Sequence, residues 1–362
     1  MDIIAHRRAL HQIPEPDVRL PKTAAYLRGV LQDYRCKLFS PIENSLCAYF
    51  DFGARKTIAF RADMDALPIT ERTGLPFASR HEGYMHACGH DGHMAIGLEL
   101  ARRLNGQTEF PNNVLLVFQP AEETVGGANL LCQTGFLQEY GVEAIFALHL
   151  WPGQAAGTIS SRKNEMLSRC CELTVEITGK PAHVAKSWEA KDATAAAVAF
   201  YSRIQALEQS VPASVRRLLK FGKMTSGTVR NIISGYSRLE GTLRTYDDSW
   251  FDRLYQGILD IAAQVQQETG CTVDVRRETG YLAVINHPGL FDQVKGLVDF
   301  DVLEEPSMIS EDFSYYQRQV PGVFFFLGLG DTPPLHNDRF NFDETLLLQG
   351  ADFFWTLANK YC

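Results

Sequence analysis

The first residues that could carry chemistry lie in the stretch HACGHDGH, residues 86–93, which holds three of the ten histidines and one of the eight cysteines. Thiolate and imidazole ligands suit Zn²⁺, and Mn²⁺ or Co²⁺ can occupy such a site when carboxylates join it. Cys88 and His90 are two positions apart, so both side chains point to the same face if the segment is extended. We therefore expect Cys88 and His90 to bind metal, and His86 and His93 to have supporting roles.

Polar side chains of similar types follow four apolar runs elsewhere in the chain, and each run has the pattern of a buried strand. These side chains are Asp63 and Asp65 after Thr57–Phe60, Glu122 and Glu123 after Val114–Phe118, His149 after Ala144–Leu148, and His336 after Val323–Leu327 and a Gly/Pro loop. Because the carboxyl ends of parallel strands open onto one crevice, these residues are expected to meet there although they are far apart in the sequence.

The number of candidate metal ligands is larger than one tetrahedral ion needs. The candidates are Cys88, His90, Glu123, His149 and His336. Two divalent ions with a shared ligand could use all five and keep open positions for water. The sequence therefore predicts a site for two ions per chain, drawn from Zn²⁺, Mn²⁺ and Co²⁺. Four other histidines are expected to be structural, namely His6, His11, His81 and His287.

The adjacent carboxylates of Glu122 and Glu123 suggest a division of labour. One can bind metal while its neighbour accepts a proton from water as a general base. Two glutamates after a proline can instead be solvated loop charges, but their place at the end of a buried strand favours the functional interpretation. Asp63 and Asp65 could bind metal too, although orienting a histidine ligand or a loop is the more typical role. We favour Asp65 for that role.

The segments that must position these residues form a pattern of two domains. Buried-type runs alternate with amphipathic segments such as Asp91–Leu104, which indicates an α/β domain with a mostly parallel sheet over residues 1–167 and 282–362. Residues 168–281 differ, because period-two strands there flank two helices in a β-α-β-β-α-β order. The segments in question are CELTVEITG, Ala193–Leu207, YSRLEGTLRTY, Trp250–Gln267 and CTVDVRRE. This block predicts an inserted ferredoxin-like α+β domain.

Composition narrows the class of protein. The formal net charge is -8 over 362 residues, with no basic stripe for phosphates, so a nucleic-acid partner is not expected. The first residues have no signal-peptide core, and no run approaches the length of a membrane helix, so a cytoplasmic protein without a membrane partner is expected. The eight cysteines lack paired spacing, which is typical of reduced thiols in a chain of this size.

Ten fragments, in order, show a resemblance that covers nearly the whole chain. They are HRRALHQIPE, FRADMDALPI, MHACGHDGHMA, FQPAEETVGGA, ALHLWP, ITGKPAH, NIISGYSRLEGTLRT, SEDFSYY, and VPGVFFFLG with LHNDRFNFDE. Together they resemble the M20 family of metallopeptidases and amidohydrolases. The similar branch contains N-acyl-amino-acid amidohydrolases, hippurate hydrolases, indole-3-acetyl-amino-acid hydrolases and N-acetyldiaminopimelate deacetylase.

The resemblance implies a zinc-peptidase-like catalytic domain with a dinuclear centre. Matched motif by motif, the ligands fall on the same five positions, Cys88, His90, Glu123, His149 and His336. Cys88 would bridge the two ions, and Glu122 would be the catalytic base.

The resemblance also implies that the inserted block is a lid that commonly mediates dimerisation. His183, in GKPAH, falls where the family stabilises an oxyanion, in some members from the partner subunit. Asn231 and Arg244 fall where it positions substrate groups, although a surface ion pair is the alternative for Arg244. The chain departs from the pattern at VAKSWEAKDA, where AAxPHxGxDP is usual, and at Ser234, where proline is usual. Both departures bear on substrate identity more than on catalysis.

The expected activity is hydrolysis of the amide bond of a small N-acyl amino acid, a linear C–N bond, by a homodimer. Three alternatives stay open at this point. One is a dipeptidase or carboxypeptidase with the same metals. Another is a cysteine hydrolase with Cys88 as the nucleophile. The third is a catalytically inactive metal-binding or interaction module, against which the intact Glu122 argues.

Overall fold

The apolar runs of the sequence form the central strands of one sheet in the computed structural model, which describes residues 2–361. The chain divides into two compact units, of which one comprises Met1–Met166, Val284–Pro306 and Asp312–Cys362. The other comprises Leu167–Ala283 and Ser307–Glu311. The second unit contains the block expected over 168–281 and also includes 167, 282–283 and 307–311. Cys362 lies outside the described residues, and the other seven cysteines are free thiols.

The first unit is built on an eight-stranded sheet with the order β1-β2-β4-β3-β5-β16-β6-β15. Its strands are β1 (Lys37–Phe39), β2 (Leu46–Phe50), β3 (Thr57–Asp63), β4 (Asn113–Gln119), β5 (Val142–Trp151), β6 (Ile159–Ser161), β15 (Asp301–Val302) and β16 (Gly322–Gly328). The central strands β4, β3, β5 and β16 are mutually parallel, whereas β2 and β6 pair antiparallel with their neighbours. The mostly parallel sheet expected from the sequence is confirmed.

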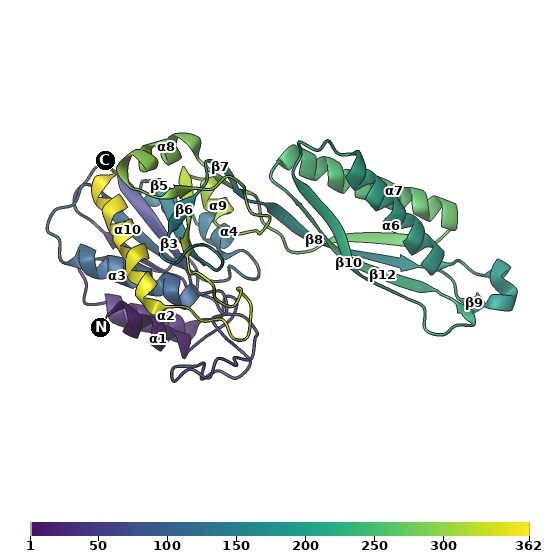
Figure 1. Cartoon of the computed structure of the whole chain (residues 1–362), viewed down its shortest axis with the longest axis horizontal. Helices are drawn as coiled ribbons and strands as arrows, with labels where there is room; N and C mark the ends of the chain where they lie inside the picture. Colours follow the sequence, from purple (N-terminus) through teal and green to yellow (C-terminus); the bar gives the residue numbers. More distant parts are fainter. Residues whose placement is uncertain (1, 362) are drawn as a thin grey trace. The chain divides into compact units, whose positions relative to one another are not determined.

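Helices cover both faces of this sheet, as expected for strands that are buried along their length (Figure 1). They are α1 (Ile3–His11), α2 (Pro21–Leu31), α3 (His90–Asn105), α4 (Gly127–Cys132), α5 (Phe136–Glu139), α8 (Pro288–Leu297), α9 (Ser314–Gln317), the 3₁₀ turn η2 (Glu344–Leu346) and α10 (Leu347–Lys360). A short ladder joins β7 (Asn164–Leu167) and β14 (Val284–Asn286). Helix α3 packs between α1 and α10 and against β3.

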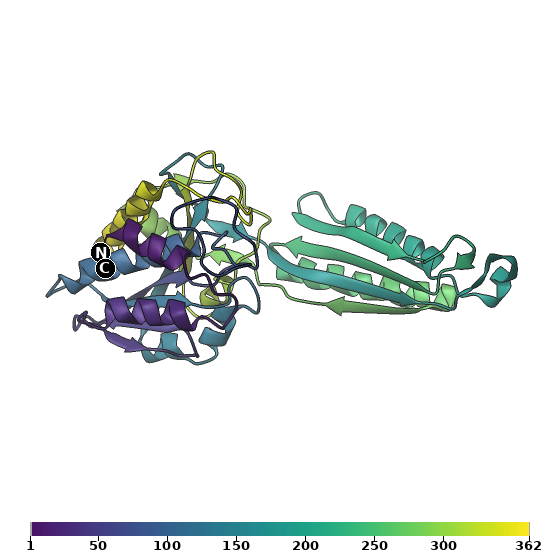
Figure 2. The same cartoon turned by 90° about the horizontal axis from the view of Figure 1, so that it is seen from below.

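The second unit is an antiparallel sheet with two helices on one face (Figure 2). Its elements are β8 (Arg169–Thr178), β9 (Ala182–His183), η1 (Val184–Glu189), α6 (Ala193–Ser210), β10 (Arg217–Ser226), β11 (Ile232–Ile233), β12 (Tyr236–Thr245), α7 (Asp248–Thr269) and β13 (Thr272–Arg277). The sheet order β10-β12-β8-β13 is that of a ferredoxin-like sandwich. Strand β10 is the member of the predicted order to which no residues were assigned.

The two helices of this unit begin where the sequence supplies a side-chain cap. Asp192 accepts hydrogen bonds from the backbone N–H groups of Thr194 and Ala195, and Asp247 does the same for α7. The apolar faces of α6 and α7 cover a separate core, which includes Phe200, Leu239 and Ile258. Within residues 2–361, no helix is both long enough and apolar enough to cross a membrane.

Candidate metal centre

The three turns that carry candidate ligands each contain a residue in the left-handed region of backbone space. Gly89, between Cys88 and His90, has φ 85°, and a Cβ there would lie 3.0 Å from a methyl carbon of Leu150. Ala121 has φ 59° and His336 has φ 64°. Such conformations are costly for residues other than glycine and concentrate at functional sites. The expectation of an extended segment at Cys88–His90 is therefore wrong, because a left-handed turn that ends at α3 brings the two side chains together.

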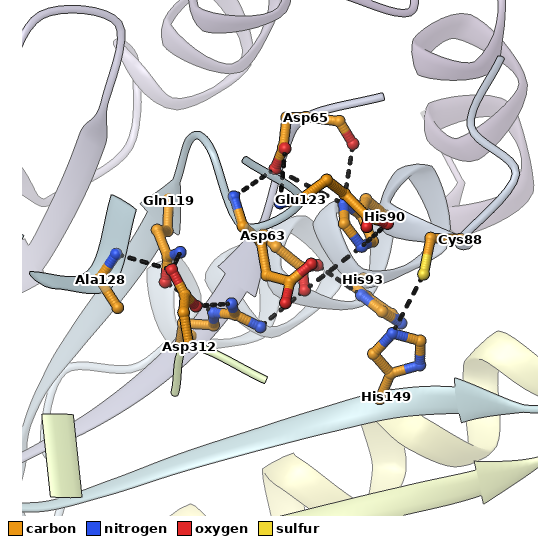
Figure 3. Close-up of polar contacts among 12 residues, drawn as sticks. Asp63, Asp65, Cys88, His90, His93, Gln119, Glu123, Ala128, His149 and Asp312 are labelled. Carbon is orange, nitrogen blue, oxygen red and sulfur yellow. Dashed lines mark hydrogen bonds and ion pairs between the residues drawn. The ribbon is translucent and has the colours of Figure 1, made fainter. Parts of the chain in front are cut away.

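Cys88, His90 and His149 approach one another at the carboxyl end of the sheet (Figure 3). The Sγ atom of Cys88 lies 3.5 Å from Nε2 of His149. The rings of His90 and His149 have centroids 6.1 Å apart and are nearly perpendicular. Cys88 lies in the turn before α3, whereas His149 lies within β5. The contact between Cys88 and His149 therefore depends on the packing of α3 against the sheet.

Glu123 connects this group to His336, which comes from the C-terminal part of the chain. Its Oε1 lies 3.2 Å from Nε2 of His336 and 3.9 Å from Nε2 of His90. Ligand-type atoms of Cys88, Glu123 and His336 all fall within 4.8 Å of one another. The backbone N–H of His336 donates to the carbonyl of Ala87 over 2.8 Å, which ties the two ligand-bearing turns together. The structure thus brings the five predicted ligands into one cluster.

The hydrogen bonds of this cluster leave atoms free in the directions that a metal would need. Nδ1 of His90 donates to the carbonyl of Asp65, and Nδ1 of His149 donates to that of Leu150, at 2.8 and 2.7 Å. Both rings therefore offer a lone pair on Nε2, as metal-binding histidines do. Nε2 of His90 and Oε1 of Glu123 are buried and have no hydrogen-bond partner within residues 2–361. Unpaired buried polar atoms are costly, so the donor set fits bound cations.

Asp65 holds the turn that carries the two glutamates. Its two carboxylate oxygens accept the backbone N–H groups of Glu122 and Glu123 at 2.9 and 3.0 Å. Its own carbonyl is the group that orients His90. One buried residue therefore fixes both a histidine ligand and the Glu122–Glu123 turn, which is the geometry that the orienting role assigned to Asp65 requires.

His93 lies beside the cluster, but both of its ring nitrogens are engaged. Nδ1 lies 2.5 Å from Oδ1 of Asp63, and Nε2 accepts the backbone N–H of Leu150 at 2.9 Å. A ring held in this way supports β5 next to His149 and has no lone pair left for a metal. His86 is also buried, at 1% exposed, and neither of its ring nitrogens has a hydrogen-bond partner among the described residues.

A buried polar network next to the cluster, joined to it through Asp63 and His93, was not predicted from the sequence. The guanidinium of Arg61 donates to Gln119, Asp63 and Asp312 at 2.9, 2.6 and 2.7 Å. Asp312 in turn accepts from the backbone N–H of Ala128 (Figure 3). The network fixes Asp63 from the side opposite His93. The only sequence signal for it was the charged residue Arg61 within the buried run of β3.

Burial and neighbouring carboxylates set the protonation of the cluster without metal. Burial, together with Glu123 and Glu122, raises the pKa of the Cys88 thiol well above its ordinary value. Burial and the nearby His93 lower the pKa of His149. Cys88 is therefore a neutral thiol here, and a cation would reverse this by favouring the thiolate. An activated cysteine nucleophile has the opposite property, since its pKa is lowered.

The remaining predicted residues lie in the second unit, at two different ends of its sheet. His183 pairs with Ile232 across the β9–β11 ladder, and the Asn231 carbonyl accepts the N–H of Val184, so His183 and Asn231 are neighbours. Arg244 lies near the opposite end of β12, eight positions from Tyr236 or about 26 Å along a strand. Its guanidinium donates to the Met308 carbonyl at 2.9 Å and contacts Glu172 at 3.4 Å.

Comparisons with known proteins agree with this architecture. The model of peptidase family M20/M25/M40 matches residues 59–360. An N-acetyldiaminopimelate deacetylase of Streptococcus uberis is 37% identical over 362 aligned residues, with 96% of each chain covered.

Two solved structures extend the likeness to three dimensions. One, of a protein from methicillin-resistant Staphylococcus aureus, is 29% identical with a TM-score of 0.91 and covers 99% of this chain and 96% of that one. The other is a dinuclear metal-binding peptidase of family M20 from Bacillus subtilis. It is 28% identical with a TM-score of 0.82, and the match covers 98% of this chain and 96% of that one.

Proposed function

Because the chain belongs to peptidase family M20/M25/M40, we propose that it hydrolyses the amide bond of a small N-acyl amino acid at a centre of two divalent metal ions. One observation carries the proposal. Five side chains of the types that bind such ions converge from four distant parts of the first unit, and two of their buried atoms have no hydrogen-bond partner among the described residues.

The proposed ligands are the five clustered residues, Cys88, His90, Glu123, His149 and His336. Cys88 would be the ligand shared by the two ions, since its Sγ lies close to both His149 and the Glu123–His336 pair. Zn²⁺, Mn²⁺ and Co²⁺ all accept this mixture of sulfur, nitrogen and oxygen donors. Bound there, the ions would polarise the scissile carbonyl and lower the pKa of the attacking water towards neutrality.

Glu122 is the proposed general base. It is 6% exposed, and its carboxylate lies within 4.8 Å of the ligand atoms of His90 and Glu123. The Asp65 carboxylate fixes its backbone N–H, so the side chain is held next to the cluster. Glu122 would accept the proton of the attacking water and deliver it to the leaving amine, while His183 would donate a hydrogen bond to the developing oxyanion.

The substrate class rests on the relatives. The deacetylase of Streptococcus uberis acts, by its name, on an N-acetyl amino acid, and it matches this chain over nearly its full length. The Bacillus subtilis structure is named a peptidase, which keeps a dipeptidase or carboxypeptidase as the second candidate. The substrates of these candidates differ in one group. A dipeptide has a free ammonium next to the acyl carbon of the scissile bond, and an N-acyl amino acid has none.

This difference provides the test of the proposed function. We expect the Mn²⁺-, Co²⁺- or Zn²⁺-loaded protein to release free amine from N-acetyl amino acids faster than from the matching free-amine dipeptides. The dipeptides with a blocked N-terminus serve as the control for side-chain size. Faster cleavage of the free dipeptides would favour the peptidase, and no cleavage of either class by protein that holds its metal would contradict the proposal.

A second copy of the chain is the proposed source of His183 and Asn231. The segments that connect the second unit to the rest of the chain lie at the Arg244 end of β12, where Ser168 bonds Ile309 and Cys170 bonds Tyr281. His183 and Asn231 lie beyond the other end of that strand. Residues at the two ends of one sheet cannot both reach one small substrate from the same chain, so we propose a homodimer in which each site receives His183 from the partner.

Mixing two inactive variants tests this arrangement. We expect Glu122→Gln and His183→Ala proteins to be inactive alone, and an equal mixture that has exchanged subunits to recover roughly a quarter of the wild-type activity, because half of the dimers are mixed and each has one complete site. Activity is measured after unfolding and refolding the mixture together. A mixture of the same proteins refolded separately is the control. No recovery in proven mixed dimers would show that His183 acts within its own chain.

A further inference from the structure

Helix α1 lies against the first turn of α3, and a buried ion cluster joins them. Nε of Arg7 donates to Oδ2 of Asp91 at 3.0 Å, and Nδ1 of His11 lies 2.8 Å from the same oxygen. The side chains of Arg7, His11 and Asp91 are at most 1% exposed. Asp91 directly follows His90 in α3. The motif HRRALHQIPE therefore supplies two cations to the residue next to a proposed ligand.

The same arginine also holds the segment that follows His336. Nη1 of Arg7 lies 3.0 Å from a carboxylate oxygen of Glu344, and Nη2 donates to Oδ1 of Asn341 at 3.1 Å. Its guanidinium carbon lies 4.3 Å from the ring centroid of Phe342. The planar guanidinium thus contacts α3 through one nitrogen and the segment 337–344, called the C-terminal loop below, through the other two. A lysine cannot reproduce this geometry.

His11 extends the connection to the loop before Cys88. Its Nε2 lies 3.3 Å from Oε1 of Glu71, whose other oxygen accepts the N–H of Ser79 at 2.6 Å. Although burial acts against the charged ring, Asp91 and Glu71 raise the pKa of His11 to about 9. At neutral pH the imidazole is therefore protonated and donates through both nitrogens.

We propose that Arg7 and His11 are positioning residues of the metal centre, which fix the spacing between the ligands of α3 and the C-terminal loop without touching a metal. The proposal rests on the proposed function, because it needs the cluster to hold cations. Buried ion pairs contribute little to stability on average. Here the contacts of Arg7 and His11 reach segments that carry or flank a proposed ligand. We therefore expect these contacts to determine the positions of the ligands more than the stability of the fold. Loss of such outer contacts typically weakens metal affinity by about 10- to 100-fold.

The test compares Mn²⁺ binding in wild type and Arg7→Lys by titration, with electron paramagnetic resonance to detect spin coupling between two bound ions. Lysine keeps the charge next to Asp91 and loses the contacts with Asn341 and Glu344. We expect the folded variant to bind one ion as wild type does and the ion that uses His336 about 10- to 100-fold more weakly, so that the coupled signal appears only at higher Mn²⁺.

Two further variants keep the result interpretable. Asn341→Ala removes the contact of Nη2 of Arg7 with the C-terminal loop and leaves the contacts with Phe342 and Glu344. It should weaken binding of the same ion, and it serves as the test if Arg7→Lys fails to fold. Arg8→Gln is the matched control, because Arg8 shares Glu344 but is exposed and contacts neither Asp91 nor Asn341. It should bind both ions normally. Unchanged affinities and spectra in folded Asn341→Ala would overturn the proposal, whereas failure of the wild type to bind two ions would instead contradict the proposed function.

Discussion

Glu122→Gln protein is expected to keep its metal ions, and its kcat for amide hydrolysis is expected to fall by about 10²- to 10⁴-fold. This is the range that a positioned general base contributes. Glutamine has the size of glutamate but cannot accept the proton of the attacking water. The backbone N–H of residue 122 still bonds to Asp65, so the turn is kept. The checks are metal content by mass spectrometry of the purified protein and steady-state kinetics with an N-acetyl amino acid.

The neighbouring glutamate provides the matched control. Glu123→Gln removes a carboxylate that contacts His90 and His336, so this variant should lose metal affinity together with activity. The contrast between the pair separates proton transfer from metal binding at adjacent positions. Near wild-type turnover by metal-loaded Glu122→Gln protein would show that another group is the base.

Removal of the metal ions is expected to reduce amide hydrolysis by about 10³-fold or more, since Lewis-acid stabilisation is worth several kcal/mol and each 1.36 kcal/mol is tenfold in rate. A strong chelator followed by dialysis should remove the activity, and added Mn²⁺, Co²⁺ or Zn²⁺ should restore it. The unfilled cluster would then contain Nε2 of His90 and Oε1 of Glu123 without hydrogen-bond partners among the described residues.

This experiment also tests the alternative in which Cys88 is a thiol nucleophile. The approach of Cys88 to His149 at 3.5 Å resembles a Cys–His pair, but burial and two carboxylates raise the thiol's pKa well above its ordinary value. A cysteine hydrolase would keep its activity in chelator. Cys88→Ser should weaken metal binding, whereas Cys36→Ala, at a half-buried thiol outside the cluster, should leave it unchanged.

The sequence by itself determined the parallel sheet and which residues follow its strands. Continuous apolar runs such as those of β3, β4, β5 and β16 occur where both faces of a strand are covered, and chain direction in a parallel sheet sends the residues behind them to one edge. The grouping of Glu123, His149 and His336 follows from that topology. The order and spacing of the motifs indicated the family, and period-two strands around two helices indicated the inserted α+β block.

Only the tertiary structure decided how the individual groups are held. Apolar periodicity reports burial along a segment and says nothing of hydrogen bonds between segments distant in the chain, such as those of Asp65 with Glu122 and of Arg7 with Asp91. Nor does it reveal a left-handed residue that is not glycine, such as Ala121. For the same reason the contacts of His11 with Asp91 and Glu71, and the separation of Arg244 from His183 along β12, could not be predicted from the sequence.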